Sequence, residues 1–534
     1  MKTLRCLTNI AFVTSLAILA SCSSENELEV NNEKNENNGN ATTEKLVFSA
    51  SIEGNETTRA KLNSSDNTLH WEAGDQIAVF SPKENKYEAF TIDSKYNDKT
   101  IAYFVNDMSS LKTPDATGDF SYYYAFYPYE AVTSISGSNF NRANFTIKTE
   151  QTVTDGYTYD RSAVLMMARA TPSEKAFEFK NVNALLKVTI KNNADGKVKY
   201  IKILSNNSSK TLTGNFYANI TGNGVNTYNV SDNNSYVQLE IPASPDNNPV
   251  DYYLSVFQNN CDQGFTLLLE SEFGRYEEGS QSIYQRVYTG NITFNKSNIY
   301  DMGSYDVKTL PFMEHAVDLN LSSGTIWTTR NVDTTPQFVA NWYDEGGYYS
   351  WGETAMKDSY GSGDYTKRSD IYTQYSYKEG NTSKTYYVLN KQYDVASQIE
   401  GSGVYCMPTY TQITELHGLS KTYYMSGTKW NDQNGVKFTG YKDRYLWLPA
   451  GGYVINSFFQ QGATSKGSKC YYWSRILYNE DTDRAYSLDY ENGSLDPHDW
   501  SGGGEWRDRR YCGKNVRPIV KNRGIERYKN IPNN

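Results

Sequence analysis

The hydrophobic positions of this chain fall into short runs separated by polar turns over most of its length. In the segment 45–55, KLVFSASIEGN, apolar and polar residues roughly alternate and the run stops at Gly54-Asn55, which predicts a strand followed by a loop. Further strands are expected within residues 77–80, 121–130, 175–192, 235–243 and 251–257. Strand-sized segments at this spacing are typical of β-sandwiches.

Beyond about residue 315 the pattern includes a helix as well as strands. Thr409 and Gln412 form a capping-box motif, and Ile413 and Leu416 share one face of the helix that follows. Gly418 is expected to end this helix in the left-handed conformation. A helix among strands predicts an α+β arrangement for this part of the chain.

Aromatic and aliphatic residues are dense in the later strand-like segments. YLWLPA (445–450) and YYWS (471–474) have the composition of core strands, so Trp447 and Trp473 are expected to be buried. Asn492-Gly493 predicts a type I′ hairpin turn. Together these patterns predict a mainly β protein whose C-terminal part is α+β.

The first apolar run of the chain has a different character. Basic Lys2 and Arg5 precede apolar residues over about 10–20, a run shorter than the ~20 residues of a membrane-spanning helix but long enough for a secretory signal. Leu19-Ala20-Ser21-Cys22 resembles the lipobox of bacterial lipoproteins. The resemblance implies a signal peptide at 1–21 and lipidation of Cys22, which would anchor the protein to outer-membrane lipid at the cell surface or in a fimbrium. The alternative is an ordinary signal peptide with an incidental cysteine.

The segment that follows, residues 22–44, is rich in Asn and Glu. Its large aliphatic residues are Leu28 and Val30, too few to bury a core. We expect a disordered tether that holds the folded part away from the membrane.

Composition and charge narrow the functional classes. Aromatic residues make up 14% of the chain, which contains 46 Tyr, and this favours strands and turns over helices. The net charge is −9 without a long basic run, which argues against nucleic acid as a partner. The four His residues are widely separated and lie outside any metal-binding spacing, so no metal site is expected. Neither a nucleophile–base pair nor a cofactor loop is recognisable, so we expect no catalytic residues and no cofactor.

The order of several segments before residue 305 resembles a known family. TTRA, WEAGDQIAVF, AFYPY and FEFKNVNALLKVTI follow one another as in the fimbrillin family, the Mfa-like lipoprotein pilins of the Bacteroidales. The resemblance implies two consecutive transthyretin-like β-sandwiches, which we place at 45–174 and 175–305.

Arg59 gains a candidate role from this resemblance. In the family, a trypsin-like protease cuts after an arginine in this loop and removes the first strand, here Lys45 to Glu53. A sandwich that loses a strand exposes unpaired backbone groups, which a strand of another fimbrial subunit can fill by β-augmentation. The alternative is that Arg59 is a surface loop residue and the first strand stays in place.

After a linker at 306–314, the chain resembles a second family. AVDLNLSSGTIWTTRNV, GGYYSWGET, YCMPTYTQITELHGL, YLWLPAGGY and CYYWSRILY follow in the order found in the Fibrobacter succinogenes major paralogous domain. The resemblance implies a C-type-lectin-like fold over 315–521, shared with formylglycine-generating enzymes, and a tail at 522–534. Those enzymes use a closely spaced cysteine pair, whereas Cys470 and Cys512 lie far apart in sequence, so their chemistry is not expected here.

Cys470 and Cys512 are a candidate disulfide on the same resemblance. The fold implies that the strand carrying Cys470 and the final strand run close together, and the exported location is oxidising. Two buried free thiols are the alternative, because they would look the same in sequence.

A loop near the C-terminus carries the candidate ligand-binding residues. LDPHDWSGGGEWRDRRY displays Trp500 and Trp506 beside His498 and Asp499, a set suited to stacking against a sugar ring with hydrogen bonds at its rim. The alternative is a loop that folds its own Trp residues onto the domain.

The two family resemblances imply a fimbrial tip or minor subunit with an adhesive C-terminal domain that binds a surface glycan or protein. A solitary surface lipoprotein that binds such a ligand without polymerising is the alternative. The third hypothesis is an enzyme of the formylglycine-generating-like fold, and no motif in the sequence supports it.

Overall fold

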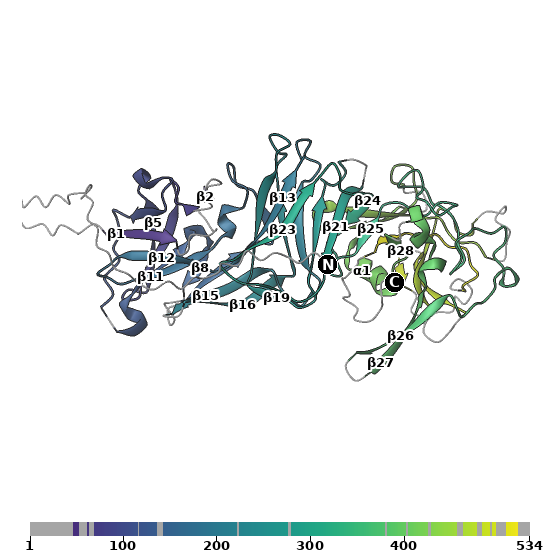
Figure 1. The fold of residues 1–534 in the computed structure, drawn as a ribbon. Helices are drawn as coiled ribbons and strands as arrows, with labels where there is room; N and C mark the ends of the chain where they lie inside the picture. Colours follow the sequence, from purple (N-terminus) through teal and green to yellow (C-terminus); the bar gives the residue numbers. More distant parts are fainter. Residues whose placement is uncertain are drawn as a thin grey trace, which may run out of the picture.

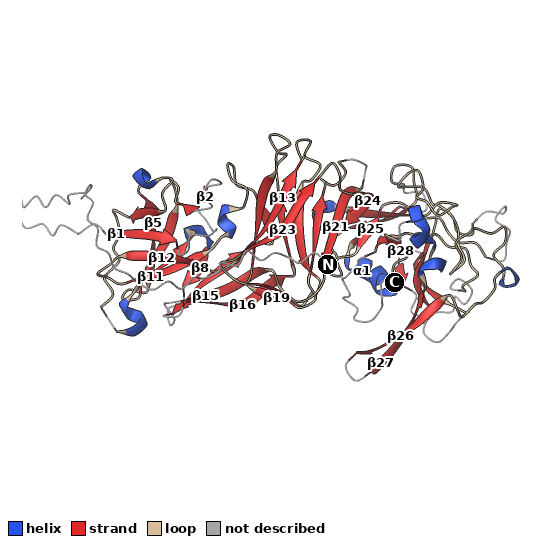
Figure 2. Cartoon of the chain, in the orientation of Figure 1, coloured by secondary structure: helices blue, strands red, loops and turns tan. Residues whose placement is uncertain are grey.

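The computed structural model describes most of the chain between residues 46 and 521. Strands dominate it, so the mainly β fold class predicted from the sequence is confirmed (Figure 2). No helix within the described ranges is long and apolar enough to cross a membrane. The described residues are 46–52, 61–62, 69–115, 117–135, 142–221, 224–275, 279–379, 382–401, 404–424, 429–455, 463–477, 483–491, 494–497 and 509–521.

The N-terminal part is a closed barrel in which the first strand pairs with both of its neighbours. Inward-facing residues such as Phe48, Phe90 and Phe177 fill the interior. The first strand runs antiparallel to β6 and parallel to β12, and it thereby closes the barrel (Figure 1). The order around the barrel is β1 (Val47–Ile52), β12 (Ala176–Asn181), β11 (Met166–Ala170), β7 (Tyr123–Tyr127), β4 (Gln76–Ser81), β5 (Lys86–Ile92) and β6 (Ile101–Val105).

A four-stranded sheet covers one side of this barrel. Its order is β16 (Gly224–Asn234), β15 (Thr213–Thr221), β9 (Arg142–Ile147) and β8 (Val132–Ile135). Phe145 and Phe216 of this sheet stack at 5.6 Å between ring centroids and join a cluster with Phe80 and Phe126, which face outward from the barrel. Strands from both sides of residue 174, the expected boundary of the first unit, therefore share a sheet, and β12 beyond it completes the barrel.

The middle part is a sandwich of two sheets. One is β18 (Val250–Val256), β13 (Ala184–Lys191) and β23 (Ile299–Asp306). The facing sheet includes β10 (Glu150–Thr152), β17 (Tyr236–Glu240), β14 (Tyr200–Ser205), β20 (Phe265–Glu270) and β21 (Gln281–Tyr288). Leu186 and Leu254 of the first sheet pack on Ile203 and Leu267 of the second.

The second of these sheets does not end at β21 but continues into the C-terminal part. β24 (Met313–Asp318) pairs with β21, then β25 (Ile326–Thr328), β35 (Ile519–Val520) and β28 (Tyr405–Cys406) follow, which makes nine strands in one sheet. The expected linker at 306–314 runs from the last residue of β23 to the start of β24. The middle and C-terminal parts are thus joined by backbone hydrogen bonds as well as by the chain.

Two further sheets and one short helix complete the C-terminal part. The hairpin of β26 and β27 extends away from the body of the molecule (Figure 1). Trp473 and Trp447 are buried, as predicted. One sheet has the order β26 (Tyr372–Glu379), β27 (Thr382–Leu389), β32 (Cys470–Leu477), β33 (Ala485–Glu491) and β34 (Ser494–Pro497), and the other β29 (Ser420–Tyr424), β30 (Gly435–Thr439) and β31 (Tyr445–Pro449). Short pairs elsewhere are β2 (Lys61–Leu62) with β3 (Leu69–His70) and β19 (Asn259–Cys261) with β22 (Ile292–Phe294).

The helix α1 (Tyr410–Glu415) begins as the sequence predicts. The Thr409 hydroxyl accepts from the backbone N–H of Gln412, and the Gln412 side chain accepts from the backbone N–H of Thr409 at 2.8 Å. The predicted left-handed end at Gly418 is wrong, because the chain continues into a 3₁₀ turn over Leu416–Gly418 without a positive φ at the glycine. The predicted hairpin across Asn492-Gly493 is confirmed by the pairing of β33 with β34.

Candidate functional site

Most of the site residues predicted from the sequence lie outside the described residues. These are the lipidation site Cys22, the cleavage candidate Arg59 and the ligand-binding candidates His498, Asp499, Trp500 and Trp506. Each stays a prediction. Within the described part of the chain, no group of three or more His, Cys, Asp or Glu side chains could hold a metal ion.

Cys470 and Cys512, the candidate disulfide pair, are both buried and are not joined by a disulfide in this structure. Cys470 belongs to the cluster with Tyr472 and its thiol donates to the backbone oxygen of Leu448 at 3.5 Å. Cys512 belongs to the cluster with Trp473. Since neighbouring residues of a strand face opposite ways, the two thiols lie on opposite sides of β32. Burial also raises the pKa of Cys470, which keeps this thiol protonated and unreactive.

The strand β1 is the first candidate site that the structure presents. Phe48 is fully buried, with its ring stacked on Phe177 at 4.9 Å and edge-on to Tyr123 at 4.9 Å and Phe90 at 5.3 Å between centroids. The Trp71 indole N–H donates to the backbone oxygen of Ala50 at 3.2 Å, which ties the strand to the barrel interior. These side chains form the apolar anchor of β1.

Both edges of β1 carry backbone pairing. On one side residues 47–51 pair with 101–105 of β6, and on the other residues 49–52 pair with 176–179 of β12. Without β1, two strand edges and an apolar groove would face solvent, and a strand of similar pattern could restore both. This is a site for strand binding rather than for chemistry.

The second candidate site lies where the middle sandwich meets the C-terminal part. Lys202 of β14, Glu270 of β20, Asp318 of β24 and Arg444, just before β31, are all at most 4% exposed. The Lys202 ammonium donates to the Asp318 carboxylate and to Asn320 Oδ1 at 3.0 Å. Arg444 Nη1 donates to Glu270 Oε2 at 3.2 Å and to the backbone oxygen of Asp318 at 3.1 Å. Two cations and two carboxylates thus form one buried charge cluster, which we call the junction cluster.

The two carboxylates of the junction cluster have different acidities. Burial raises the pKa of Glu270 to about 7 against the opposing charge of Arg444. Its other oxygen, Oε1, is buried without a hydrogen-bond partner among the described residues. Burial also acts on Asp318, but Lys202 and Arg444 outweigh it and lower the pKa of that carboxyl to about 2. Around neutral pH, Asp318 is therefore the fully ionised member and Glu270 the one that takes up a proton.

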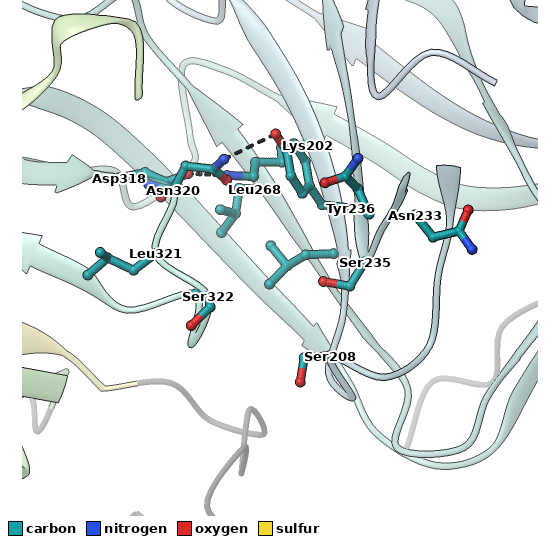
Figure 3. A pocket seen from close by; sticks show the side chains of 13 residues that line it. Lys202, Ser208, Asn233, Ser235, Tyr236, Leu268, Asp318, Asn320, Leu321 and Ser322 are labelled. Carbon is teal, nitrogen blue, oxygen red and sulfur yellow. Dashed lines mark hydrogen bonds and ion pairs between the residues drawn. The ribbon is translucent and has the colours of Figure 1, made fainter. Parts of the chain in front are cut away.

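A cavity of about 310 Å³ lies beside this cluster. Figure 3 shows the side chains that line it, with Lys202 and Asp318 of the cluster among them. The middle sandwich supplies residues of β14, β17 and β20 and the turn after β14. The end of β16 supplies Asn233 and Asn234, and the C-terminal part supplies Asp318 of β24 and the loop after it. It is lined by Lys202, Leu204, Ser208, Asn233, Asn234, Ser235, Tyr236, Leu268, Asp318, Asn320, Leu321, Ser322 and Gly324. We call it the junction cavity.

Sequence reasoning missed the junction cluster and cavity. In β14, Ile201 and Ile203 face the sandwich core while Lys202 and Leu204 face the C-terminal part, so both faces of the strand are buried. The usable signal is a single charged residue inside a short apolar run, as in YIKILS, or at its end, as in FTLLLE. Such a charge must find a partner, but the sequence does not say where the partner lies.

Comparisons with known proteins give a limited result. No known family profile matches the chain, and no curated protein matches it. Among solved structures, it is similar to a proposed cell adhesion protein of Bacteroides uniformis, with 12% identity over 51% of this chain and 97% of that chain and a TM-score of 0.32. A second proposed cell adhesion protein, from Bacteroides ovatus, has 16% identity over 50% and 94% and a TM-score of 0.30. A fimbrial protein of Bacteroides ovatus has 11% identity over 88% and 98% and a TM-score of 0.22. With identities and TM-scores this low, the fold rests on the chain's own sheets.

Proposed function

We propose that this protein is a cell-surface adhesion protein that enters a fimbrium as a tip or minor subunit by accepting a partner's strand in place of β1. In this proposal Cys22 anchors the exported chain to outer-membrane lipid, and cleavage at Arg59 releases Lys45 to Glu53. The C-terminal part then presents a surface ligand site, with the Trp500 loop as one candidate.

The observation that carries the proposal is the position of β1. It is the first described strand of the chain, it is hydrogen-bonded on both edges, and its apolar anchor is centred on one residue, Phe48. Because β1 precedes every other described strand, it can leave without unthreading any of them. The groove it leaves would accept an extended segment with apolar side chains at alternate positions.

The C-terminal end of the middle sandwich supports a subunit that accepts a strand from a partner but does not donate one. After β23, the chain enters β24, which is paired on both sides within this molecule. The described residues that follow the middle sandwich therefore pair with the sheet of that sandwich or belong to the C-terminal part. A subunit that accepts a strand but does not offer one from this position would end a filament.

A solitary surface protein that binds a ligand is the second candidate function. The observation in its favour is that the barrel is complete with β1 in place, so the uncut chain has no vacant strand position there. In that case Arg59 would stay uncut and the C-terminal part would act alone.

Strand exchange tests the proposal on the full-length chain. Residues 54–60 are replaced by the recognition sequence of a specific protease, and the folded protein is cut and mixed with a fluorescent peptide KLVFSASIE, the sequence of residues 45–53. Cut protein should take up the peptide in place of β1, and uncut protein should not. A peptide with Phe48→Asp is the matched control, because a charge in the apolar groove is strongly disfavoured. Cut protein that never binds the intact peptide would refute strand acceptance.

Antibody-gold labelling of residues 315–521 on intact cells separates the two functions. Gold at filament ends supports a tip subunit, and gold scattered over the cell body without filaments supports the solitary protein.

A further inference from the structure

The junction cavity is the strongest unassigned feature of the molecule. Its walls come from two parts of the chain, and pockets for small ligands occur preferentially at such junctions. With a volume of about 310 Å³, it lies at the small end of the usual range for ligand sites. An occupant would therefore be one or two rings in size.

The charge of the cavity excludes charged ligands. Lys202 and Asp318 are the charged residues of the lining, and each neutralises the other through a direct ion pair. Both are nearly inaccessible to solvent, at 4% and 2% exposure. An anionic or cationic ligand would meet no uncompensated opposite charge there and would lose its hydration without return. A neutral ligand incurs no such cost.

The rest of the lining is divided between apolar and neutral polar groups. Leu204, Leu268 and Leu321 are buried and form an apolar surface. Asn and Ser side chains surround it, and Figure 3 shows Ser235, Ser322 and Ser208 around the opening. Amides and hydroxyls both donate and accept hydrogen bonds, as the hydroxyls of a sugar do. A pyranose ring has the matching division, with an apolar C–H face and polar edges.

The polar rim keeps hydrogen-bonding capacity for a ligand. Within the described part of the chain, the Ser208 hydroxyl has no hydrogen-bond partner. Asn234 lies near the same edge, where its amide N–H donates to the Thr149 hydroxyl at 2.9 Å and its side-chain oxygen can accept. Deeper in, Asn320 is held by Lys202 and donates to the Tyr236 hydroxyl at 3.1 Å, which fixes the inner wall before any ligand arrives.

We propose that the junction cavity binds a neutral saccharide unit, a monosaccharide or disaccharide, between the middle sandwich and the C-terminal part. The site deepens the proposed adhesive function by naming a ligand class and a place for it. Its biological meaning rests on that function, but binding in solution does not depend on strand exchange. Failure here and failure of the peptide-exchange test are therefore distinguishable.

The test uses the full-length protein and a defined panel of probes. Galactose, N-acetylglucosamine, lactose and maltose represent neutral sugars, and glucuronic acid, sialic acid and glucosamine represent charged ones. Saturation-transfer NMR and calorimetry measure binding to the unaltered protein. At least one neutral sugar should bind, and charged sugars of the same size should bind at least about tenfold more weakly, the factor that 1.4 kcal/mol of lost affinity gives.

Two neighbouring serines supply matched variants. Ser208→Trp places a large ring at the rim of the cavity, whereas Ser209→Trp adds the same ring at an exposed residue outside the lining. Ser208→Trp should weaken sugar binding at least tenfold and Ser209→Trp should leave it unchanged. Asn234→Trp is a second blocking variant in case Ser208→Trp disturbs folding, which thermal unfolding would detect. The proposal is overturned if no neutral sugar of the panel binds, if charged sugars bind better, or if a folded blocking variant binds as the unaltered protein does.

Discussion

The N-terminal barrel and the junction between the middle sandwich and the C-terminal part cover their strand edges in different ways. On the N-terminal side, the barrel is closed by one short strand, β1, whose anchor is an aromatic cluster around Phe48. On the C-terminal side, the edge of β21 is covered by β24 within a sheet of nine strands, and four buried charges cross the same junction. Both arrangements hide a strand edge, which an isolated sheet would expose.

The two arrangements differ in how readily the covering element could dissociate from the rest of the molecule. β1 is held by backbone pairing, by apolar contacts and by hydrogen bonds such as that from the Trp71 indole N–H to the backbone oxygen of Ala50, and another strand of similar pattern could replace all of these. The junction is held by pairing, by the apolar cluster that Leu268 and Ile283 share with Trp473, and by charges whose partners lie on different elements. A replacement would have to satisfy all of these together. The strand β1 is thus suited to exchange with another strand, whereas the junction is suited to a permanent contact.

Removing Arg444 is the strongest way to break this comparison. Arg444→Met retains a long, unbranched side chain but removes the guanidinium. Glu270 is then left without its cation in a fully buried position. We expect the free energy of unfolding to fall by roughly 3–5 kcal/mol, the usual cost of breaking a buried ion pair. Denaturant unfolding measures this directly.

The control for Arg444 lies two residues away. Lys442 also links the C-terminal part to the sandwich, through Glu150 at 3.1 Å, but its side chain is 39% exposed. Lys442→Met should therefore cost less than about 1 kcal/mol. Equal losses in the two variants would mean that burial of the charges does not strengthen the junction.

Shortening the Phe48 side chain tests how β1 is held in the barrel, and the expected effect is smaller. Phe48→Leu removes the aromatic contacts to Phe90, Tyr123 and Phe177 and leaves part of the ring volume empty. We expect a loss of about 1–3 kcal/mol, confined to the barrel. Hydrogen exchange should quicken in β1, β6 and β12 while β20 and β21 keep their protection.

The control for Phe48 is a residue on the outer face of the barrel. Tyr103 is 40% exposed and pairs with Ser49, so Tyr103→Leu should change the stability by less than about 0.5 kcal/mol. If Phe48→Leu loosened β20 and β21 equally, β1 would not be a separable element.

Local features of the chain could be predicted from the sequence, and long-range ones could not. The strand at 47–52, the capping box of Thr409 and Gln412 and the hairpin after β33 each depend on residues a few positions apart, and they were found. The pairing of β9 with β15 and the ion pair of Lys202 with Asp318 join residues 69 and 116 positions apart. Alternation of apolar residues shows that a strand has a buried face but does not show which strand lies beside it.

The last predicted effect is the pH dependence of the junction cluster, which sharpens the comparison because β1 carries no titratable group. Glu270 has a pKa of about 7 in the folded protein against a usual value of 4.5, so the folded state binds more protons between these two pH values. Its contribution to stability is therefore largest below about pH 4.5 and is lost as the pH rises through 7. Asp318, with its pKa lowered to about 2, stays ionised across the range from pH 5 to 8 and adds no slope there.

Glu270→Gln isolates this contribution, because glutamine can still accept a hydrogen bond from Arg444 but does not titrate. Between pH 8 and pH 5, the unaltered protein should gain stability relative to Glu270→Gln by roughly 2–3 kcal/mol. Denaturant unfolding of both proteins at each pH gives the difference, in which titration of groups common to both cancels. Parallel pH profiles for the two proteins would show that Glu270 does not take up a proton on folding and that the junction cluster, like β1, holds its parts together without regard to pH.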